Sequence, residues 1–391
     1  MINNFNISDF LKNHWQKKPL IIRSAFPEYQ SPISAEELAG LACESFVESR
    51  IISENKSAPN WTLENGPFKE ARFSQLPETH WTLLIQSLNK LMPELDDLLH
   101  EFDFIPTWRV DDLMASYAAP YGSVGPHLDQ YDVFLLQASG RRKWMISEQS
   151  VTDDNFEKDL SLKIIKNFTA ESEWMLEAGD ILYLPPNVSH YGVAAEKDNE
   201  DEDDCITFSI GFRAPSHADL LTAYVDQYVT ELSDDIRYND PALTENGNSG
   251  EISSAAINKI QDILISHINN KENIKNWFGR YITEYLNSED DFFESELQVN
   301  EFINNYKQSK VLRRPAIVRA NYIRQNDNTI QLYINGQHYP IDMEASDIAM
   351  LFCDQHLLIY DAISTTLSNN KSCQLLCDLF NAGYLEFEDD E

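Results

Sequence analysis

Short apolar segments separated by turn residues fill the stretch from about residue 109 to residue 213. The segments are residues 113–118, 133–138, 144–146, 179–184 and 206–212. Glycine and proline residues cluster between them. Short strands at such spacing are typical of an antiparallel sandwich or barrel. This part of the chain is therefore predicted to be a β-domain.

The first hundred residues have a mixed pattern, with apolar positions at helical spacing in two places. Ser34, followed three residues later by Glu37, forms a capping-box pattern that predicts a helix over 34–44. A second helical run is predicted over 81–91, and it is expected to end at Pro93 because proline interrupts helical hydrogen bonding.

From residue 216 to about residue 306 the pattern is helical, with helices predicted over 217–237, 252–268 and 274–287. Two of these helices carry broad apolar stripes, formed by Ile257, Ile260, Ile263, Leu264, Ile268, Trp277, Tyr281 and Tyr285. Such helices either pack within their own domain or form a dimer interface. The breadth of the stripes favours association, so a homodimer is expected.

The last part of the chain, residues 307–391, has the pattern of a small α+β unit. Two strands, 330–334 and 338–341, flank Asn335-Gly336, which is a strong hairpin signal. A hairpin with helices is typical of a winged-helix-like module, which raises the question of DNA binding. Residues 341–391 contain 11 acidic residues and one base, so no DNA binding is expected.

Composition narrows the class of protein. The chain has 391 residues and a formal net charge of −34, which disfavours nucleic acid. The acidity either attracts a basic protein partner or only keeps the protein soluble. No apolar run is long enough to span a membrane, and the N-terminus lacks the features of a secretory signal. The five scattered cysteines indicate reduced thiols. A cytoplasmic protein without a membrane segment is expected.

A candidate metal site begins with His127 and Asp129. Residues i and i+2 of a strand project from the same face, so both side chains are expected to enter one pocket. His190, on a distant strand, would complete a set of two imidazoles and one carboxylate, which is typical of non-haem Fe(II) oxygenases. The alternatives are that His127 pairs only with Asp129, or that His190 is a structural loop histidine.

A second His-x-Asp sequence, His217 and Asp219, has a different context. Ser216 precedes it, and an apolar run at helical spacing follows it. Ser216 and Asp219 therefore form a variant capping box at a helix start, and no metal role is expected there.

Arg142 is a candidate for binding an acidic co-substrate. Arg142, Trp144 and Ile146 share one face of a predicted strand, so Arg142 is expected to point inward, while Arg141 and Lys143 face solvent. A guanidinium suits bidentate binding of a carboxylate. In oxygenases that use 2-oxoglutarate, the carboxylate remote from the metal needs such a charge.

Several motifs carry a resemblance to a known family. Residues 116–134 (SYAAPYGSVGPHLDQYDVF), 140–142 (GRR), 179–186 (GDILYLPP) and 211–215 (GFRAP) occur in the order found in the bacterial ribosomal oxygenases, and 14–20 (HWQKKPL) is similar too. The motifs of this chain resemble this Jumonji-C-type, cupin-related family over roughly residues 1–215. The acidic run 196–204 and the longer loop near 239–250 depart from it.

The resemblance implies an α+β protein with a double-stranded β-helix oxygenase domain of jelly-roll or cupin type. The domains would be residues 1–215, with the β-helix over about 100–215, a helical dimerisation region over 216–306 and a winged-helix-like domain over 307–391.

The same resemblance implies a function. His127, Asp129 and His190 would bind Fe(II), and Ser116 and Arg142 would bind 2-oxoglutarate, with O2 as the second co-substrate. The reaction would hydroxylate the β-carbon of an arginine in large-subunit ribosomal protein sixteen. The alternatives are hydroxylation of a histidine in another ribosomal protein, protein demethylation on the same fold, and a non-enzymatic interaction protein.

Overall fold

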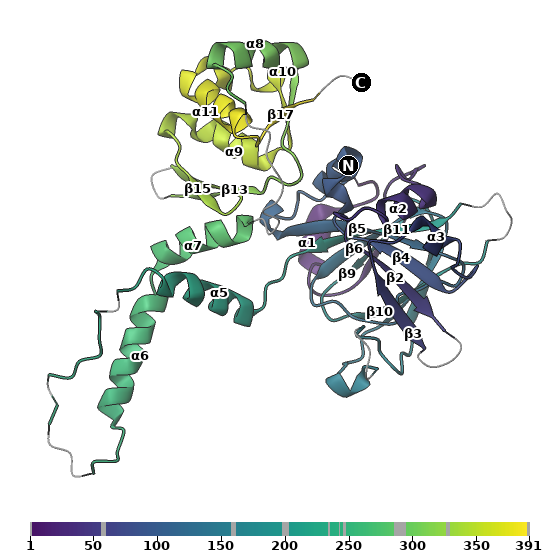
Figure 1. Ribbon diagram of the computed structural model, residues 1–391, viewed down its shortest axis with the longest axis horizontal. Helices are drawn as coiled ribbons and strands as arrows, with labels where there is room; N and C mark the ends of the chain where they lie inside the picture. The colour runs from purple at the N-terminus through teal and green to yellow at the C-terminus, as the bar shows by residue number, and fades with distance from the viewer. Residues whose placement is uncertain are drawn as a thin grey trace. The chain divides into compact units, whose positions relative to one another are not determined.

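The computed structural model describes residues 2–55, 60–157, 162–197, 203–233, 235–241, 243–244, 248–284, 295–325 and 329–388. The chain divides into two compact units, Met1–Ala214 and Pro215–Glu391 (Figure 1). Each unit is described by itself. The bounds of the three domains implied by the family resemblance remain a prediction.

The first unit is built on two antiparallel sheets. The larger sheet has the strand order β1-β9-β6-β11-β5-β4-β2-β3, and the smaller has the order β10-β7-β8. The strands are β1 (Leu20–Ile22), β2 (Ser49–Glu54), β3 (Trp61–Asn65), β4 (Trp81–Ile85), β5 (Val110–Ala118), β6 (Asp132–Ser139), β7 (Arg142–Ser147), β8 (Ser172–Leu176), β9 (Ile181–Leu184), β10 (Ser189–Ala194) and β11 (Cys205–Phe212). Each of the five strands predicted after residue 109 is present.

The larger sheet is buried on both faces. On β6, Phe134 and Leu136 belong to a core shared with the N-terminal helices, whereas Val133 and Leu135 pack with Trp144 of the smaller sheet. The helices of this unit are α1 (Ile7–Asn13), α2 (Ala35–Leu41), α3 (Glu70–Phe73) and α4 (Pro93–His100), with 3-10 turns η1 (Leu88–Lys90), η2 (Thr107–Arg109) and η3 (Asp153–Asn155). Side chains therefore alternate between a helix-covered core and the space between the sheets.

The helix predicted over 34–44 is confirmed as α2, with Ser34 and Glu37 forming the predicted capping box. The helix predicted over 81–91 is wrong. Residues Trp81–Ile85 form β4, which pairs with both β2 and β5. Four consecutive residues of this strand are buried, so the alternation that marks a half-exposed strand is missing from its sequence. Pro93 opens α4 instead of ending a helix, since the first helical position needs no N–H donor.

The second unit begins with three helices, α5 (His217–Val229), α6 (Ser254–Ile268) and α7 (Lys271–Thr283). The helix predicted over 217–237 is thus shorter than expected. The helix predicted over 252–268 is confirmed, and that over 274–287 begins earlier and ends at Thr283, with 285–287 outside the described residues.

The rest of this unit is a compact α+β module. Its strands are β12 (Val311–Arg313), β13 (Ala320–Arg324), β14 (Ile330–Ile334), β15 (Gln337–Tyr339), β16 (Leu357–Ile359) and β17 (Glu386–Phe387). Its helices are α8 (Val299–Ser309), α9 (Ser346–Asp354), α10 (Tyr360–Ile363) and α11 (Asn370–Asn381), with turns η4 (Met343–Ala345) and η5 (Thr366–Ser368). The predicted hairpin is confirmed as β14–β15, and Asn335 and Gly336 take the positive φ values of 44° and 79° that its tight turn requires.

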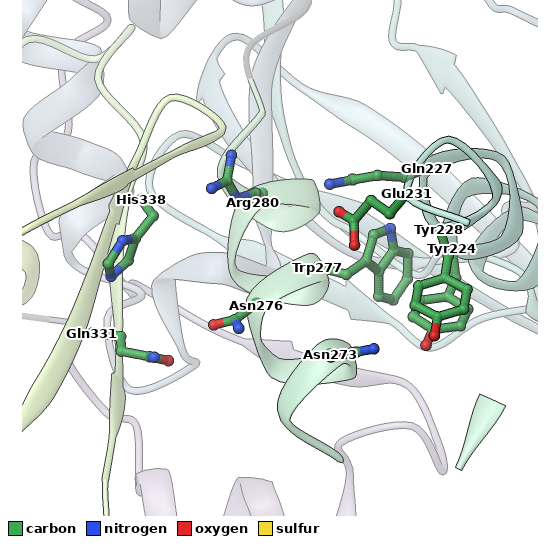
Figure 2. Close-up of a pocket in the computed structure, with 10 residues that line it drawn as sticks. All are labelled: Tyr224, Gln227, Tyr228, Glu231, Asn273, Asn276, Trp277, Arg280, Gln331 and His338. Atoms are coloured by element: carbon green, nitrogen blue, oxygen red, sulfur yellow. The ribbon is translucent and has the colours of Figure 1, made fainter. Parts of the chain in front are cut away.

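A polar pocket lies between α5, α7 and the β14–β15 hairpin (Figure 2). Its aromatic side chains pack on one another: Tyr224 stacks on Tyr228 with ring centroids 5.6 Å apart, and Trp277 meets Tyr224 edge-on at 5.2 Å. The Tyr224 hydroxyl donates to the carbonyl of His267 at 3.0 Å. No helix in the described parts of the chain is both long and apolar enough for a membrane span, and all five cysteines are free.

Candidate active site

His127, Asp129 and His190 lie together. The Nε2 atoms of His127 and His190 are 4.0 and 3.6 Å from Oδ2 of Asp129, and one potential ligand atom from each residue lies within 4.8 Å of the others. This is the one such cluster of three or more histidine, cysteine or acidic residues within the described ranges. Two imidazoles and a carboxylate on one side of a metal are the ligand set of non-haem Fe(II) sites.

The backbone that brings these residues together differs from the prediction. His127 and Asp129 do not lie on a regular strand; they belong to the segment that leads into β6. His127 instead forms an isolated antiparallel bridge with His190 of β10, and the two residues exchange N–H···O bonds of 3.0 and 2.8 Å. The predicted proximity of the two side chains still holds, with Nε2 of His127 and Oδ2 of Asp129 4.0 Å apart.

Turns on each side fix this bridge. Gly125 has φ +81°, a conformation that favours glycine, and its N–H donates to Ser123 Oγ. Asn187, in the turn before β10, has φ +66°, and its N–H donates to the carbonyl of Asp129 at 2.7 Å. The Gly-Pro and Pro-Pro-Asn sequences therefore set the approach of the two halves of the site.

Both imidazoles are oriented for metal binding through Nε2. Nδ1 of His127 lies 2.9 Å from the carbonyl of Gly125, and Nδ1 of His190 lies 3.0 Å from the carbonyl of Val188. A carbonyl accepts only, so each Nδ1 carries the proton and each Nε2 keeps its lone pair. Burial, aided by the neighbouring His127, lowers the pKa of His190 to about 4, so His190 is neutral at physiological pH.

Arg142 lies inward on β7, as the alternation predicted. Its side chain is 4% exposed, and Nη1 donates to Oγ of the buried Ser116 on β5 at 3.1 Å. Nε and Nη2 have no hydrogen-bond acceptor among the described residues. Lys143, on the opposite face of β7, pairs with Glu173 at 2.7 Å. Nε and Nη2 form one edge of the guanidinium, which matches the two oxygens of a carboxylate.

These two groups of residues share a cavity of about 360 Å³. Its lining comes from β2, β4, β5, β6 and β11 of the larger sheet and from β7 and β10 of the smaller one, so it lies between the sheets. The five residues predicted from the sequence all line it: Ser116, His127, Asp129, Arg142 and His190.

Sequence reasoning missed further polar residues of this cavity. Asp112 and Ser116 both line it from β5, and alternation counted back from Ser116 would have identified Asp112. Gln86 and Ser87 donate to the Asp112 carboxylate, while burial raises its pKa. Lys163 also lines the cavity, in a loop whose sequence gives no such periodic signal.

The second His-x-Asp sequence is a helix cap, as predicted. Asp219 and Ser216 exchange backbone and side-chain hydrogen bonds of 3.0 Å each at the start of α5. His217 and Asp219 are not part of a cluster of potential metal ligands within the described residues.

Comparison with known proteins places the chain in a family. The JmjC domain family matches residues 97–220, and the ROXA-like winged helix family matches residues 265–386. The ribosomal protein uL16 3-hydroxylase of Escherichia coli (strain K12) is 34% identical over 390 residues, which cover 98% of each protein. The chain belongs to the ribosomal oxygenases. Its predicted fold class, a Jumonji-C-type oxygenase domain with a C-terminal winged helix, is thereby confirmed.

Solved structures of this family superpose on nearly the whole chain. The X-ray structure of E. coli YcfD has a TM-score of 0.85 at 32% identity and covers 99% of each chain. The structure of the YcfD ribosomal oxygenase in complex with cobalt and 2-oxoglutarate has a TM-score of 0.82 at 33% identity, covering 98% of this chain and 99% of that one.

The cavity residues fit a divalent metal and a dicarboxylate. The neutral His190, the Nε2 lone pair of His127 and the Asp129 carboxylate form a suitable donor set for the metal. The free edge of Arg142, buried in the same cavity, needs an acceptor that the described protein residues do not provide.

Proposed function

We propose that this chain is an Fe(II)- and 2-oxoglutarate-dependent hydroxylase that modifies an arginine of ribosomal protein uL16, the large-subunit protein sixteen, at the β-carbon. One observation carries the proposal: the His127, Asp129 and His190 cluster shares a cavity with the unpartnered guanidinium edge of Arg142. The similarity to the E. coli uL16 3-hydroxylase, which extends over 98% of both proteins, supports the choice of substrate.

The roles of the residues follow from their contacts. His127 and His190 would hold the metal through Nε2, and Asp129 through its carboxylate. When bound, iron with 2-oxoglutarate and O2 supplies the oxidising chemistry of the reaction. Arg142 would bind the far carboxylate of 2-oxoglutarate through Nε and Nη2, while Ser116 holds the guanidinium through Nη1.

The protein also provides apolar walls beside the reacting groups. Val133 and Leu135 line the cavity, and both belong to the buried core between the sheets. Apolar walls keep water from the reacting groups, which strengthens the ion pair with Arg142. Asp111, which pairs with Arg213 at 3.3 Å, and Asp112 bring carboxylates to the cavity that a cationic arginine side chain could approach, while Arg50 and Lys163 make the lining mixed in charge.

The wider context is part of the same proposal. We infer a cytoplasmic homodimer without direct DNA binding. Association is supported by the apolar face of α6, which exposes Ile257, Ile260, Leu264, Ile265 and Ile268 by 43–57%. A patch of this kind on a monomer would leave apolar area in water. The net charge of −34 supports a basic protein partner over nucleic acid.

Incubation of the full chain with Fe(II), 2-oxoglutarate, O2 and uL16, followed by intact-mass and fragment-ion measurement, tests the proposal. The expected result is a gain of about 16 Da, one oxygen atom, on a single arginine, with loss of 2-oxoglutarate. Loss of a methyl group from a methylated peptide, or oxidation of a histidine in another ribosomal protein, would replace this proposal with one of the alternatives. Comparing uL16 from cells with and without the chain extends the test to the natural substrate.

A further inference from the structure

Trp144 occupies the space between the candidate metal ligands and Arg142. In the register of β7 and β10, His190 pairs with Ile146, Gly192 with Trp144, and Ala194 with Arg142. Paired residues of antiparallel strands share a face, so these side chains all point into the space between the sheets. The Trp144 ring centroid is 5.8 Å from that of His190, and Cζ of Arg142 is 5.8 Å from the same indole. The indole therefore lies midway between the two ends of the proposed 2-oxoglutarate site.

Gly192 on β10 leaves the space that the Trp144 indole occupies. A Cβ at residue 192 would lie 2.7 to 2.9 Å from three atoms of the six-membered ring of Trp144, closer than van der Waals contact allows. The φ of Gly192 is not positive, so backbone conformation does not account for the glycine. The absence of a side chain here lets the indole pack directly against β10.

The indole nitrogen lacks an acceptor. Trp144 is 4% exposed, and Nε1 is buried without a hydrogen-bond partner among the described residues. Buried tryptophan N–H groups usually have a partner, and leaving one unpaired costs about 1–3 kcal/mol. Nε and Nη2 of Arg142, which line the same cavity, are unpartnered in the same way. Three buried donors around one cavity indicate a ligand with several acceptors.

We propose that Trp144 is a 2-oxoglutarate-binding residue: its indole forms the wall along the co-substrate between the metal ligands and Arg142, and its N–H donates to a carboxylate oxygen of 2-oxoglutarate. This role rests on the proposed function. A purely structural Trp144 would pack in the core between the sheets with no change in ligand binding when its N–H is removed. The unpartnered N–H distinguishes the two roles.

The substitution Trp144→Phe tests the hydrogen bond, because it keeps an aromatic ring and removes the N–H. The full chain is loaded with Mn(II), which does not turn over, and 2-oxoglutarate binding is measured by titration calorimetry. A hydrogen bond to a charged acceptor predicts about a 10-fold increase in Kd. Mn(II) affinity, measured separately by electron paramagnetic resonance, is expected to stay unchanged.

Trp174→Phe is the matched control. Trp174 lies opposite Trp144 on β8, does not line the cavity, and is expected to leave the 2-oxoglutarate Kd unchanged. Gly192→Ala is the second variant: it keeps the N–H but displaces the indole, and it is also expected to weaken 2-oxoglutarate binding. If circular dichroism shows that Trp144→Phe does not fold, the 2-oxoglutarate Kd of Gly192→Ala tests the role of Trp144 in its place.

The outcomes separate the inference from the proposed function. If the wild-type chain with Mn(II) does not bind 2-oxoglutarate, the proposed function fails. If the wild type binds but Trp144→Phe or a folded Gly192→Ala binds within twofold of it, the Trp144 role is wrong and the N–H bonds to water instead. Equal weakening by Trp174→Phe would also overturn the role, because it would indicate a general loss of packing.

Discussion

The two units each contain a cavity of similar size, about 360 Å³ between the sheets of the first and about 370 Å³ between α5, α7 and the hairpin of the second. Their polar groups differ. In the first, Arg142 and Trp144 are buried with N–H groups that lack acceptors among the described residues. In the second, whose lining side chains Figure 2 labels, Gln227, Glu231 and His338 are exposed. Exposed polar groups bond to water at little cost, whereas buried polar groups need a partner. Buried donors without a partner therefore indicate the ligand site, and the volume of the cavity does not.

The secondary structure explains the difference. β7 sends Arg142 and Trp144 into the buried space between the sheets, while Lys143 on its other face is partly exposed, so the packing of that buried face fixes Arg142 and Trp144. A surface helix such as α5 projects its polar side chains into solvent from the edge of an apolar face. The Tyr224 hydroxyl of the second pocket already has an acceptor, the backbone carbonyl of His267.

The largest effect is expected from Asp129→Ala. Removing the carboxylate from the ligand set should lower metal affinity and 2-oxoglutarate turnover by at least about 100-fold, because even residues that only support metal ligands contribute 10- to 100-fold. Metal content after dialysis and 2-oxoglutarate consumption measure this. Asp219→Ala, in the second His-x-Asp sequence, is the control: it weakens a helix cap and should leave turnover unchanged. Equal loss in both variants would contradict the metal assignment.

The next effect concerns Arg142→Met, which keeps the length of the side chain and removes its charge. Losing charge-assisted hydrogen bonds worth about 1.5–3 kcal/mol each predicts at least a 10-fold rise in the 2-oxoglutarate Kd. Calorimetry with Mn(II) measures it. Lys143→Met, on the other face of β7, breaks only the exposed pair with Glu173 and should not change the Kd. If Lys143→Met raised the 2-oxoglutarate Kd as much as Arg142→Met does, long-range attraction rather than direct contact would explain the effect.

The sequence predicted the site better than it predicted some of the surrounding elements. Period-two alternation placed His127 with Asp129 and turned Arg142 inward, whereas Ser116 was given only by the family resemblance and His190 by its motif. The helix predicted over 81–91 failed for a related reason: β4 is central and buried on both faces, so its apolar run has no alternation.

Other features lay beyond sequence reasoning because they depend on tertiary contacts. The clearance between Gly192 and Trp144 follows from the register of β10 against β7, which no local pattern specifies. The bridge between His127 and His190 likewise joins segments that are distant in sequence. Of the acidic run 196–204, residues 198–202 lie outside the described part of the chain.

A smaller effect, confined to stability, is expected from Gly279→Ala in α7. A Cβ there would lie 2.4 to 2.6 Å from the ring of the buried Tyr333, so the helix and hairpin must separate, at a cost of about 1–3 kcal/mol. Urea unfolding followed by tryptophan fluorescence measures this. Gly40→Ala in α2, where a Cβ meets no atom within 4 Å, should instead be stabilising. Because Gly279 lies in the second unit, the 2-oxoglutarate Kd should not change, and a changed Kd would contradict the separation of the two cavities.

The smallest effect is expected from Arg280→Ala in the second pocket. Arg280 is partly exposed, and its guanidinium has no ion pair or hydrogen bond with any residue in the described ranges. Water can therefore satisfy it, and the free energy of unfolding should change by less than about 0.5 kcal/mol. Turnover of 2-oxoglutarate and hydroxylation of uL16 should match the wild type. Loss of uL16 hydroxylation with 2-oxoglutarate binding intact would show that this pocket takes part in substrate recognition, and exposure of polar groups would then be no guide to function in this protein.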